Sequence, residues 1–477
     1  MRNRTINKTA VLALLFSAVV SSVAISAPWA SPEYLKKASI YQIVLRNFTR
    51  DGNFAAATKM LPHVKDAGMS IVYLTPFVQM DCDMREGGWS ERQKKSGYNS
   101  PKNPYRISDY DKIDPEYGND DDFAAFNKCA HELGLKVYMD LVYLHCGPNN
   151  VIKDKFEDGF QRNADGSIRE TIWHFPYVNF KSPRVRKYLI DSMLHWISLG
   201  CDGFRCDVGD DVPIDFWVEA VTKCREVKKD LVMINEGIKE EWLEKAFDAC
   251  YAWPYSFTVR HFIQPKNGKM YIKSEKIDEQ MAYVRNYEKK LPKNALLMTF
   301  MDNHDTAADD GDNRFDRTLP VEAGNAGFVL NFLRRGIPLV FNGNEIADTS
   351  RNSFFAPVEH IARAAKTVDW ARIVQPEGQM RLELIRKLAK MRREDEVFYD
   401  GSMQWITEGE KDGIISFIRE SGNRRVLVAA NISSKIVEFS PKDIAIPNAT
   451  NAMLSQNAAK RDGTIQLGPW GYIVQEL

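Results

Sequence analysis

The chain has 477 residues, which is more than one ordinary domain needs but fits a large barrel with a small appendage. Hydrophobic residues make up 44% of it, enough for a sizeable core. Lys plus Arg equals Asp plus Glu at 64 each, so there is no bulk basic field, and we expect no nucleic acid partner.

The first 27 residues are predicted to be a signal peptide. Arg2, Arg4 and Lys8 give a positive start, an apolar run follows at 10–25, and small residues near Ala27 offer cleavage sites. The alternative is a membrane anchor, but the apolar run is short for a span of ~20 residues. We therefore expect a secreted or periplasmic protein, with no stable membrane insertion after cleavage.

From about residue 38 to 345, short apolar runs alternate with longer amphipathic ones, which predicts β/α repeats. The apolar runs are continuous, as buried parallel strands require. Eight repeats predict an α/β fold, a (β/α)8 TIM barrel spanning residues 28–397. The predicted helices include 53–67, 120–133 and 183–199. The predicted strands are 39–45, 71–74, 136–141, 203–206, 231–234, 296–300 and 338–341, with one more placed by arithmetic near 247–251.

Two connections are long, and the pattern of apolar and polar residues changes near the end of the chain. The segment 146–182, rich in Gly, Asn and Asp, is predicted to be a short excursion after strand 3, over the barrel mouth. The loop 81–98 is also long. From about Tyr399 the residues alternate as in exposed strands, which predicts a C-terminal antiparallel β domain over 398–477.

The seven cysteines show no zinc-like spacing. An odd number in an exported protein leaves at least one free thiol, unless chains are cross-linked. We expect most of them to be buried as small hydrophobic residues.

Acidic residues follow several predicted strands at the end where barrel chemistry takes place. Asp207 and Glu236 come just after two of these strands, Asp305 follows a third, and His145 follows the strand 136–141, which contains Asp140. Taken singly, each acid is explained as well by an ion pair or a helix cap. Three such acids on one face of a barrel are much less expected by chance.

The neighbours of these acids indicate different roles. Arg205 and Asp207 are two apart on a strand and share a face, so the guanidinium should keep the carboxylate ionised, as a nucleophile requires. Glu236 ends an apolar strand, where partial burial should raise its pKa and suit it to general acid catalysis.

Taken together, these segments resemble glycoside hydrolase family 13, the α-amylase family, from about residue 38 to the C-terminus. Each segment alone is a weak or moderate match, but the order and the spacings are specific. The matching segments are SIYQIVLRNF (39–48), YLTPF (73–77), PYRISDYDKIDPEYG (104–118), DLVYLH (140–145), GFRCD (203–207), INEG (234–237), FMDNHD (300–305) and GIPLVFNGNE (336–345).

The resemblance implies a retaining two-step mechanism. By position, Asp207 matches the nucleophile, Glu236 the general acid/base, and Asp305 the third carboxylate, which holds sugar hydroxyls. The matching substrate-binding residues are Arg205, which orients the nucleophile, His145 and His304, which bind sugar hydroxyls, and Tyr105, which stacks on the sugar.

The sequence departs from the family pattern in three regions. Leu144 stands where Asn, often a calcium ligand, is usual. Asp210 and Asp211 replace a common Lys-His pair and are nearer the neopullulanase and cyclomaltodextrinase types. FPYVN (175–179) fits neither common version of the family's fifth region, and the N-terminal β domain usual in those types does not precede the barrel.

Because of Leu144, we expect no required cofactor and assign no metal ligand. Calcium could instead bind at Asp81 and Asp83, or at the Asp309–Asp312 cluster. The simpler interpretation of both clusters is a solvated loop.

The expected function is that of a secreted retaining α-glycosidase that hydrolyses α-glucosidic bonds, α-1,4 above all, in starch-derived glucans or oligosaccharides. A glycosyl transferase or isomerase of the same family would use the same residues. A non-catalytic glycan-binding barrel is a further alternative, but it would not need the full set of acids. A phosphate-handling barrel is disfavoured because no Gly-rich loop follows the last strands.

Overall fold

The computed structural model describes residues 31–264, 272–307, 313–357, 367–442, 444–447 and 452–477. The predicted signal peptide and the Asp309–Asp312 cluster lie outside these residues. Among the described residues, no helix is both long and apolar enough for a membrane span.

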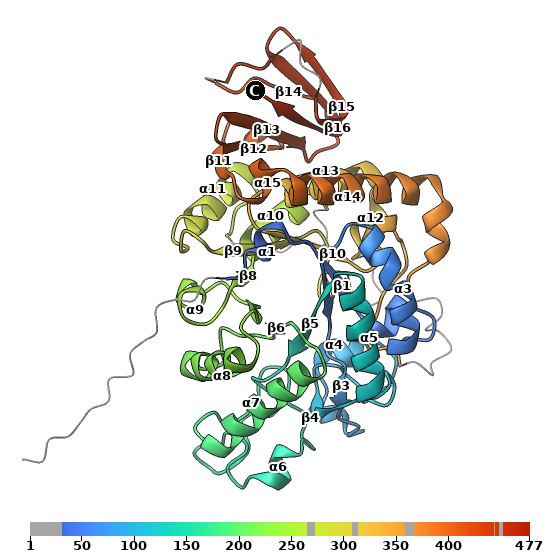
Figure 1. The fold of residues 1–477 in the computed structure, drawn as a ribbon, viewed down its shortest axis with the longest axis vertical. Coiled ribbons are helices and arrows are strands. Elements are labelled where there is room, and N and C mark those ends of the chain that lie inside the picture. Colours follow the sequence, from blue (N-terminus) through green and yellow to red (C-terminus); the bar gives the residue numbers. More distant parts are fainter. Residues whose placement is uncertain (1–30, 265–271, 308–312, 358–366, 443, 448–451) are drawn as a thin grey trace, which may run out of the picture. The chain divides into compact units, whose positions relative to one another are not determined.

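Eight parallel strands close into a barrel in the order β1-β10-β9-β8-β7-β6-β5-β2, which confirms the predicted fold (Figure 1). The strand placed by arithmetic is β8, only three residues long. The first strand is shorter than predicted because the chain turns into the short helix α2 (Leu45–Phe48). The barrel strands are β1 (Ile40–Ile43), β2 (Ile71–Leu74), β5 (Lys136–Leu141), β6 (Gly203–Cys206), β7 (Val232–Asn235), β8 (Ala249–Tyr251), β9 (Leu296–Phe300) and β10 (Ile337–Phe341).

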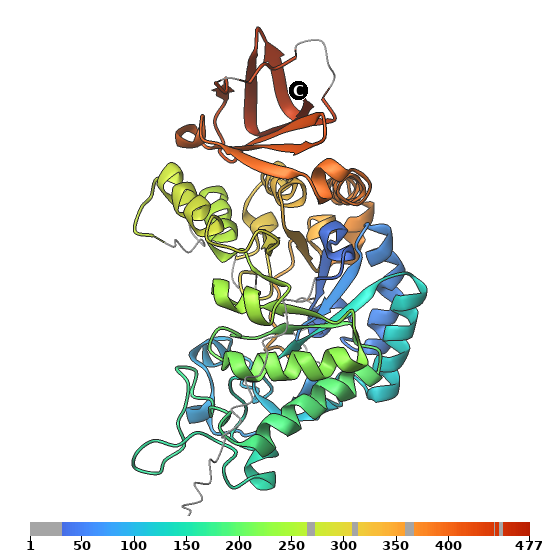
Figure 2. The same ribbon diagram turned by 60° about the vertical axis from the view of Figure 1, so that its left-hand side comes forward.

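Helices follow most of these strands and flank the barrel on its outside (Figure 2). In α5, Asn119 and Asp122 form a capping box, and acidic residues fill the first turn, where they complement the helix dipole. The longer helices are α3 (Phe54–Asp66), α5 (Asp120–Glu132), α7 (Pro183–Ser198), α8 (Ile214–Val227), α9 (Glu240–Lys245), α10 (Trp253–Ile263), α11 (Ile277–Glu288), α13 (Val321–Leu333) and α14 (Pro376–Glu394). The four-residue helices besides α2 are α1 (Tyr34–Lys37), α6 (Ile152–Lys155), α12 (Phe315–Thr318) and α15 (Glu396–Tyr399).

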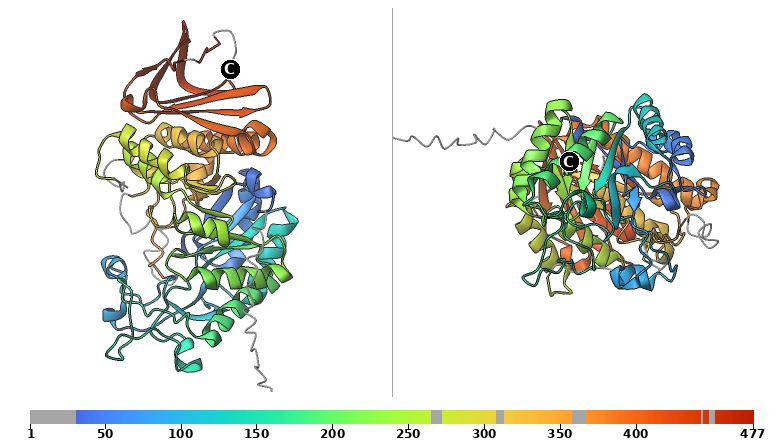
Figure 3. Two further views of the ribbon diagram at one scale, coloured as in Figure 1. Left: turned by 90° about the vertical axis from the view of Figure 1, so that its left-hand side faces the viewer. Right: turned by 90° about the horizontal axis from the view of Figure 1, so that it is seen from below.

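The two long connections carry small elements of their own. The chain between β2 and β5 forms the antiparallel pair β3 (Val78–Met80) and β4 (Ile107–Ile113), with the helix α4 (Glu91–Lys95) between them. The excursion 146–182 holds α6 and a few isolated bridges, and lies on the opposite side of the barrel from the C-terminal sheet (Figure 3).

The C-terminal residues form a six-stranded sheet, ordered β11-β12-β13-β16-β14 with β15 paired to β16, and its strand pairs are antiparallel as predicted. Helix α13 contacts this sheet and β10, which explains why it is largely apolar and buried on every side from Ala323 to Leu333. Arg419 of β12, itself buried, donates to the carbonyl oxygens of Leu333, Gly401 and Ser402 and so ties the sheet to the barrel. The strands are β11 (Ser402–Ile406), β12 (Ile414–Ser421), β13 (Arg424–Asn431), β14 (Val437–Phe439), β15 (Leu454–Arg461) and β16 (Thr464–Glu476).

The seven cysteines are all free thiols. Cys82 is exposed and Cys129 is half-buried, and the other five are buried, in agreement with the sequence-based expectation.

Candidate active site

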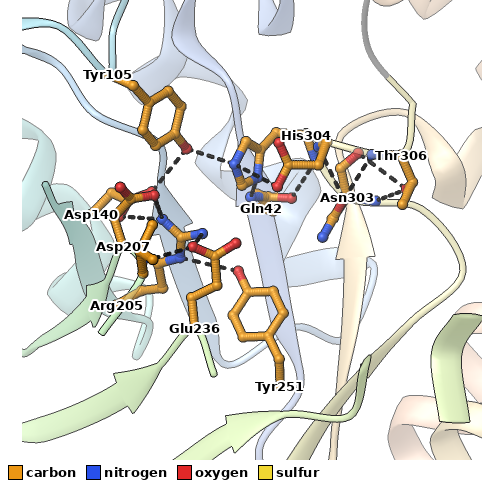
Figure 4. Close-up of polar contacts among 12 residues, drawn as sticks. Gln42, Tyr105, Asp140, Arg205, Asp207, Glu236, Tyr251, Asn303, His304 and Thr306 are labelled. Carbon is orange, nitrogen blue, oxygen red and sulfur yellow. Dashed lines mark hydrogen bonds and ion pairs between the residues drawn. The ribbon is translucent and has the colours of Figure 1, made fainter. Parts of the chain in front are cut away.

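A buried guanidinium joins the ends of three neighbouring barrel strands (Figure 4). Arg205 Nη1 lies 2.6 Å from Asp140 Oδ1 and 2.9 Å from Asp207 Oδ1. Its Nη2 lies 2.7 Å from Glu236 Oε2, and its Nε donates to the Tyr251 hydroxyl at 3.3 Å. Asp207 and Glu236 therefore both form ion pairs with Arg205 at the carboxyl end of the barrel, where their positions in the sequence had placed them.

The backbone between these acids is strained. Val208, directly after Asp207, has φ of 45°, a left-handed conformation that a β-branched residue rarely adopts. This conformation lets the Val208 N–H donate to Glu236 Oε2 at 2.9 Å. Strain of this kind is concentrated at functional sites, and here it orients one of the predicted catalytic acids.

His304 is fixed by contacts on both of its ring nitrogens. Gln42 Oε1 accepts from the His304 backbone N–H, so Gln42 Nε2 donates to His304 Nδ1 at 2.8 Å. The other nitrogen, Nε2, lies 2.6 Å from the Tyr105 hydroxyl, which in turn donates to Asp140 Oδ2 at 3.0 Å. The Tyr105 and His304 rings stack with an interplanar angle of 9°. The two predicted sugar-binding residues are thus held together beside the acids (Figure 4).

Asp305 is the most open of the three predicted catalytic acids. Its side chain is 34% exposed, against 15% for Glu236 and 8% for Asp207. Its Oδ1 accepts from Arg92 Nη1 at 2.8 Å, and its Oδ2 lies 3.4 Å from His304 Nε2.

His145 lies on the other flank of Asp207. Its Nε2 is 3.5 Å from Asp207 Oδ2, and its ring packs against Trp173 and Phe175 of the excursion. The excursion therefore helps to form the site, although its tip is exposed at Ile172.

Burial dominates the titration of the acids at this site. It raises the pKa of Glu236 to about 7, against the opposing effect of Arg205. It also raises the pKa of Asp207 well above its usual range, although Arg205 lowers it as the sequence led us to expect. Two neighbouring carboxyls with raised pKa values favour a state in which one carries a proton and the other is ionised.

The remaining groups behave differently. Burial works to raise the pKa of Asp305, but the positive charges of Arg92 and Arg205, and that of the His304 ring while it is protonated at low pH, outweigh it, and the pKa lies well below the usual range. Burial lowers the pKa of His145 to about 3 and that of His304 to about 4, so both rings are neutral near pH 7.

The positions discussed for calcium do not make a convincing site. Leu144 is buried and offers no side-chain oxygen. Asp81 accepts from the backbone N–H groups of Asp83 and Asn149, and Asp210 binds the Asn235 side chain and the Ile238 N–H. Within the described ranges, no three His, Cys, Asp or Glu side chains are grouped as metal ligands would be. Among the described residues, Leu144 and these acids therefore do not offer the set of oxygen ligands that calcium needs.

The structure brings together all seven residues predicted for the site. It also adds residues that the sequence reasoning did not assign to the site. Tyr251 ends β8 and Asp140 is the second-last residue of β5, so the same positional signal could have found them. Gln42 and Tyr73 are likewise the second-last residues of β1 and β2, and Tyr73 donates to Asp140 Oδ2 at 2.8 Å. Arg92 joins through a tertiary contact from α4, for which the sequence carried no local signal.

The model of the α-amylase catalytic domain matches residues 36–165 and 167–414 of the chain, well over half of it. The chain belongs to the α-amylase family. This confirms the resemblance drawn from the sequence, and with it the identification of the protein as an α-amylase-family glycoside hydrolase.

Several members of the family are similar over most of the chain. A cyclomaltodextrinase of Geobacillus thermopakistaniensis is 23% identical over 456 residues, which cover 89% of this chain and 70% of the relative. The α-amylase MalA of Haloarcula japonica is 23% identical over 450 residues, 90% of this chain but 60% of the relative. The crystal structure of a maltogenic α-amylase, AmyB of Thermotoga neapolitana, superposes with a TM-score of 0.75 at 26% identity, covering 93% of this chain and 99% of that one.

Proposed function

We propose that the protein is a retaining α-glycosidase that hydrolyses α-glucosidic bonds, chiefly α-1,4 bonds, in starch-derived glucans and oligosaccharides. One observation supports this most strongly: a single guanidinium holds Asp207 and Glu236 side by side, with Asp305 on a nearby strand end. Retaining enzymes need two carboxyls at short range, roughly 5 Å apart, whereas inverting enzymes leave room for water between them.

The reactive form of the pair carries its one proton on Glu236. In the first step, the ionised Asp207 of that form attacks the anomeric carbon of the sugar. The bond from that carbon to the glycosidic oxygen breaks, and Glu236 gives its proton to the departing oxygen. The products are a glycosyl ester on Asp207 and a released sugar with a free hydroxyl. The raised pKa of Glu236 keeps enough of it protonated for this step near neutral pH.

In the second step, Glu236 takes a proton from water, and the oxygen of that water attacks the same carbon. The ester bond breaks, Asp207 is again a carboxylate, and Glu236 is again protonated. Two inversions at one carbon return the α configuration.

The other residues bind the sugar that carries the reacting carbon. We assign sugar hydroxyls to Asp305, His304 and His145, and a stacking contact to Tyr105. A neutral imidazole has one donor and one acceptor nitrogen, which suits His145 to this role; His304, whose Nδ1 is held by Gln42, would bind a sugar hydroxyl through Nε2 in place of the Tyr105 hydroxyl.

The choice of substrate is supported by the relatives, which are named as a cyclomaltodextrinase, an α-amylase and a maltogenic α-amylase. The test is to incubate the protein with starch, pullulan, cyclodextrin, maltotriose, sucrose and trehalose, and to separate the products. Shortened glucans whose new reducing ends first appear as α anomers by proton NMR would support the proposal. Longer or rearranged sugars would indicate a transferase or isomerase, and no turnover of any sugar would contradict it.

We further propose that the enzyme needs no metal, and that it is exported and acts outside the cytoplasm. The first part rests on Leu144 and the engaged oxygens of Asp81 and Asp210. The second part rests on the charged and apolar pattern of residues 1–27. Fractionation of expressing cells and N-terminal sequencing of the mature protein test export. A mature chain that begins at Met1 would contradict it.

A further inference from the structure

Arg92 reaches the site from outside the barrel. It lies in α4, within the long loop 81–98. Besides its bond to Asp305 Oδ1 at 2.8 Å, its Nη2 donates to the His304 carbonyl oxygen at 3.3 Å. Its guanidinium carbon lies 4.7 Å from the centre of the Phe354 ring. Charge, hydrogen bonding and stacking thus hold the same side chain.

The helix that carries Arg92 is itself anchored. Ser90 caps it by accepting from the Gln93 N–H at 3.1 Å, and the Gln93 side chain donates to the Ser100 and Pro101 carbonyl oxygens. Trp89, which is 2% exposed, donates from its indole to the Asp83 carbonyl oxygen at 2.9 Å. The position of Arg92 therefore follows from the structure of its loop and does not depend on the Asp305 contact alone.

The bond to Arg92 makes the two oxygens of Asp305 unequal. Oδ1 is taken by the guanidinium, while Oδ2 lies beside His304 Nε2. A carboxylate that is 34% exposed has freedom to rotate unless a partner holds it. Because Oδ1 is held by Arg92, Oδ2 stays beside the ring of His304, the predicted sugar-binding histidine.

Arg92 also matters for the charge of the site. Four acids converge there, and of the described residues in contact with them only Arg92 and Arg205 carry a fixed positive charge. The histidines are neutral near pH 7, and the phenols that face the acids keep their protons because burial raises their pKa values. The groups concerned are the acids Asp140, Asp207, Glu236 and Asp305, the histidines His145 and His304, and the phenols Tyr73, Tyr105 and Tyr251.

Resting on the proposed function, we propose that Arg92 is a positioning residue that orients the Asp305 carboxylate toward the sugar hydroxyls and supplies the second positive charge of the site. The loop 81–98 is thereby part of the catalytic apparatus, along with the barrel strands. A guanidinium suits this role better than an ammonium, since its planar fork can bond Asp305 and the His304 carbonyl together.

The test compares Arg92→Met, which keeps length but not charge, with Arg92→Lys, which keeps charge but not the fork. For Arg92→Met we expect kcat/KM on a glucan to fall by about tenfold to a hundredfold, the scale that misplacement of one group produces. The pH profile of kcat/KM should rise where Asp207 ionises and fall where Glu236 loses its proton. In Arg92→Met both of these limbs should move to higher pH, because losing a cation raises the pKa values of Asp207 and Glu236. Arg92→Lys should return both limbs to their wild-type pH values, but it should recover only part of the rate.

Lys94→Met is the matched control. It removes a cation from the same helix, but the ion pair of Lys94 is with Glu91. Its rate and pH limbs should stay near wild type. A loss of rate in Arg92→Met with unmoved pH limbs and a lowered Tm would show a merely structural role and overturn the proposal, as would an unchanged rate.

A measurement without substrate separates this proposal from the proposed function. In a double-mutant cycle of Tm with Arg92→Met and Asp305→Asn, the two effects should be non-additive, because the side chains interact. Additive effects would overturn the assignment of Arg92, even in a fully active enzyme. Absence of turnover in the wild type, with a non-additive cycle, would instead refute the proposed function and leave the Arg92–Asp305 pair established.

Discussion

Replacing Glu236 with Gln removes the proposed proton donor without changing the shape of the side chain. With a pKa of about 7, about half of the Glu236 carboxyls hold the proton at pH 7. A carboxyl with the ordinary pKa of 4.5 would be protonated in only about 0.3% of molecules at that pH. Burial thus makes the acid form of Glu236 more than about a hundredfold more abundant at neutral pH.

The prediction concerns two substrates in the first step. With a natural glucan, kcat/KM of Glu236→Gln should fall by about 10²–10⁴, the usual contribution of general acid catalysis. With a nitrophenyl α-glycoside the loss should be much smaller, since this leaving group departs without a proton. The second step should stall with both substrates, because the amide cannot take a proton from water.

The pH profile is the decisive assay. In the wild type, kcat/KM on the natural substrate should decline as pH rises through about 7, because Glu236 loses its proton there. In Glu236→Gln with the nitrophenyl substrate, this decline should be absent. Equal losses for both substrates, or a decline that persists in the variant at the same pH, would refute the assignment of Glu236 as the acid.

Three further predictions use simpler assays. Asp207→Asn should remove nearly all turnover and keep its Tm, because the amide packs alike but cannot form the ester; activity above a small fraction of wild type would contradict this. EDTA treatment should leave activity and Tm unchanged, since Leu144 offers no ligand, and a large loss restored by calcium would show a site that we have not identified. Arg419→Met should lower the free energy of unfolding by about 3 kcal/mol, because the buried carbonyl groups of Leu333 and Gly401 and the part-buried one of Ser402 lose a charged donor. Urea denaturation measures this, and a change within about 0.5 kcal/mol would mean that Arg419 does not tie the sheet to the barrel.

The sequence was sufficient to predict the barrel because its strands are continuous apolar runs, which are buried on both faces. The prediction of β8 had the least support. With three residues, Ala249–Tyr251 is too short for a periodic signal, and only the count of repeats suggested a strand there. In the C-terminal domain only the β class was predicted. A strand such as β15 has a weak signal, since its residues alternate around polar positions such as Gln456 and Lys460 at a largely exposed surface.

The site was predictable where position on the barrel determines function. Asp207, Glu236 and Asp305 lie at strand ends, so their chain positions alone suggested that they meet. Arg92 was not predictable in this way, because its contact with Asp305 spans 213 positions and depends on how the loop 81–98 folds. The raised pKa of Asp207 was also missed, since the sequence showed the neighbouring Arg205 but not the depth of burial that opposes it.

The most direct test of the mechanism is to trap the glycosyl-enzyme. A fluorinated α-glucosyl substrate that forms the ester quickly but releases it slowly should inactivate the enzyme with one label per chain. Proteolysis and mass spectrometry should then place that label on Asp207. A label on another residue, or none while normal substrate is turned over to a β product, would contradict the account of Asp207 as the nucleophile of a retaining glycosidase.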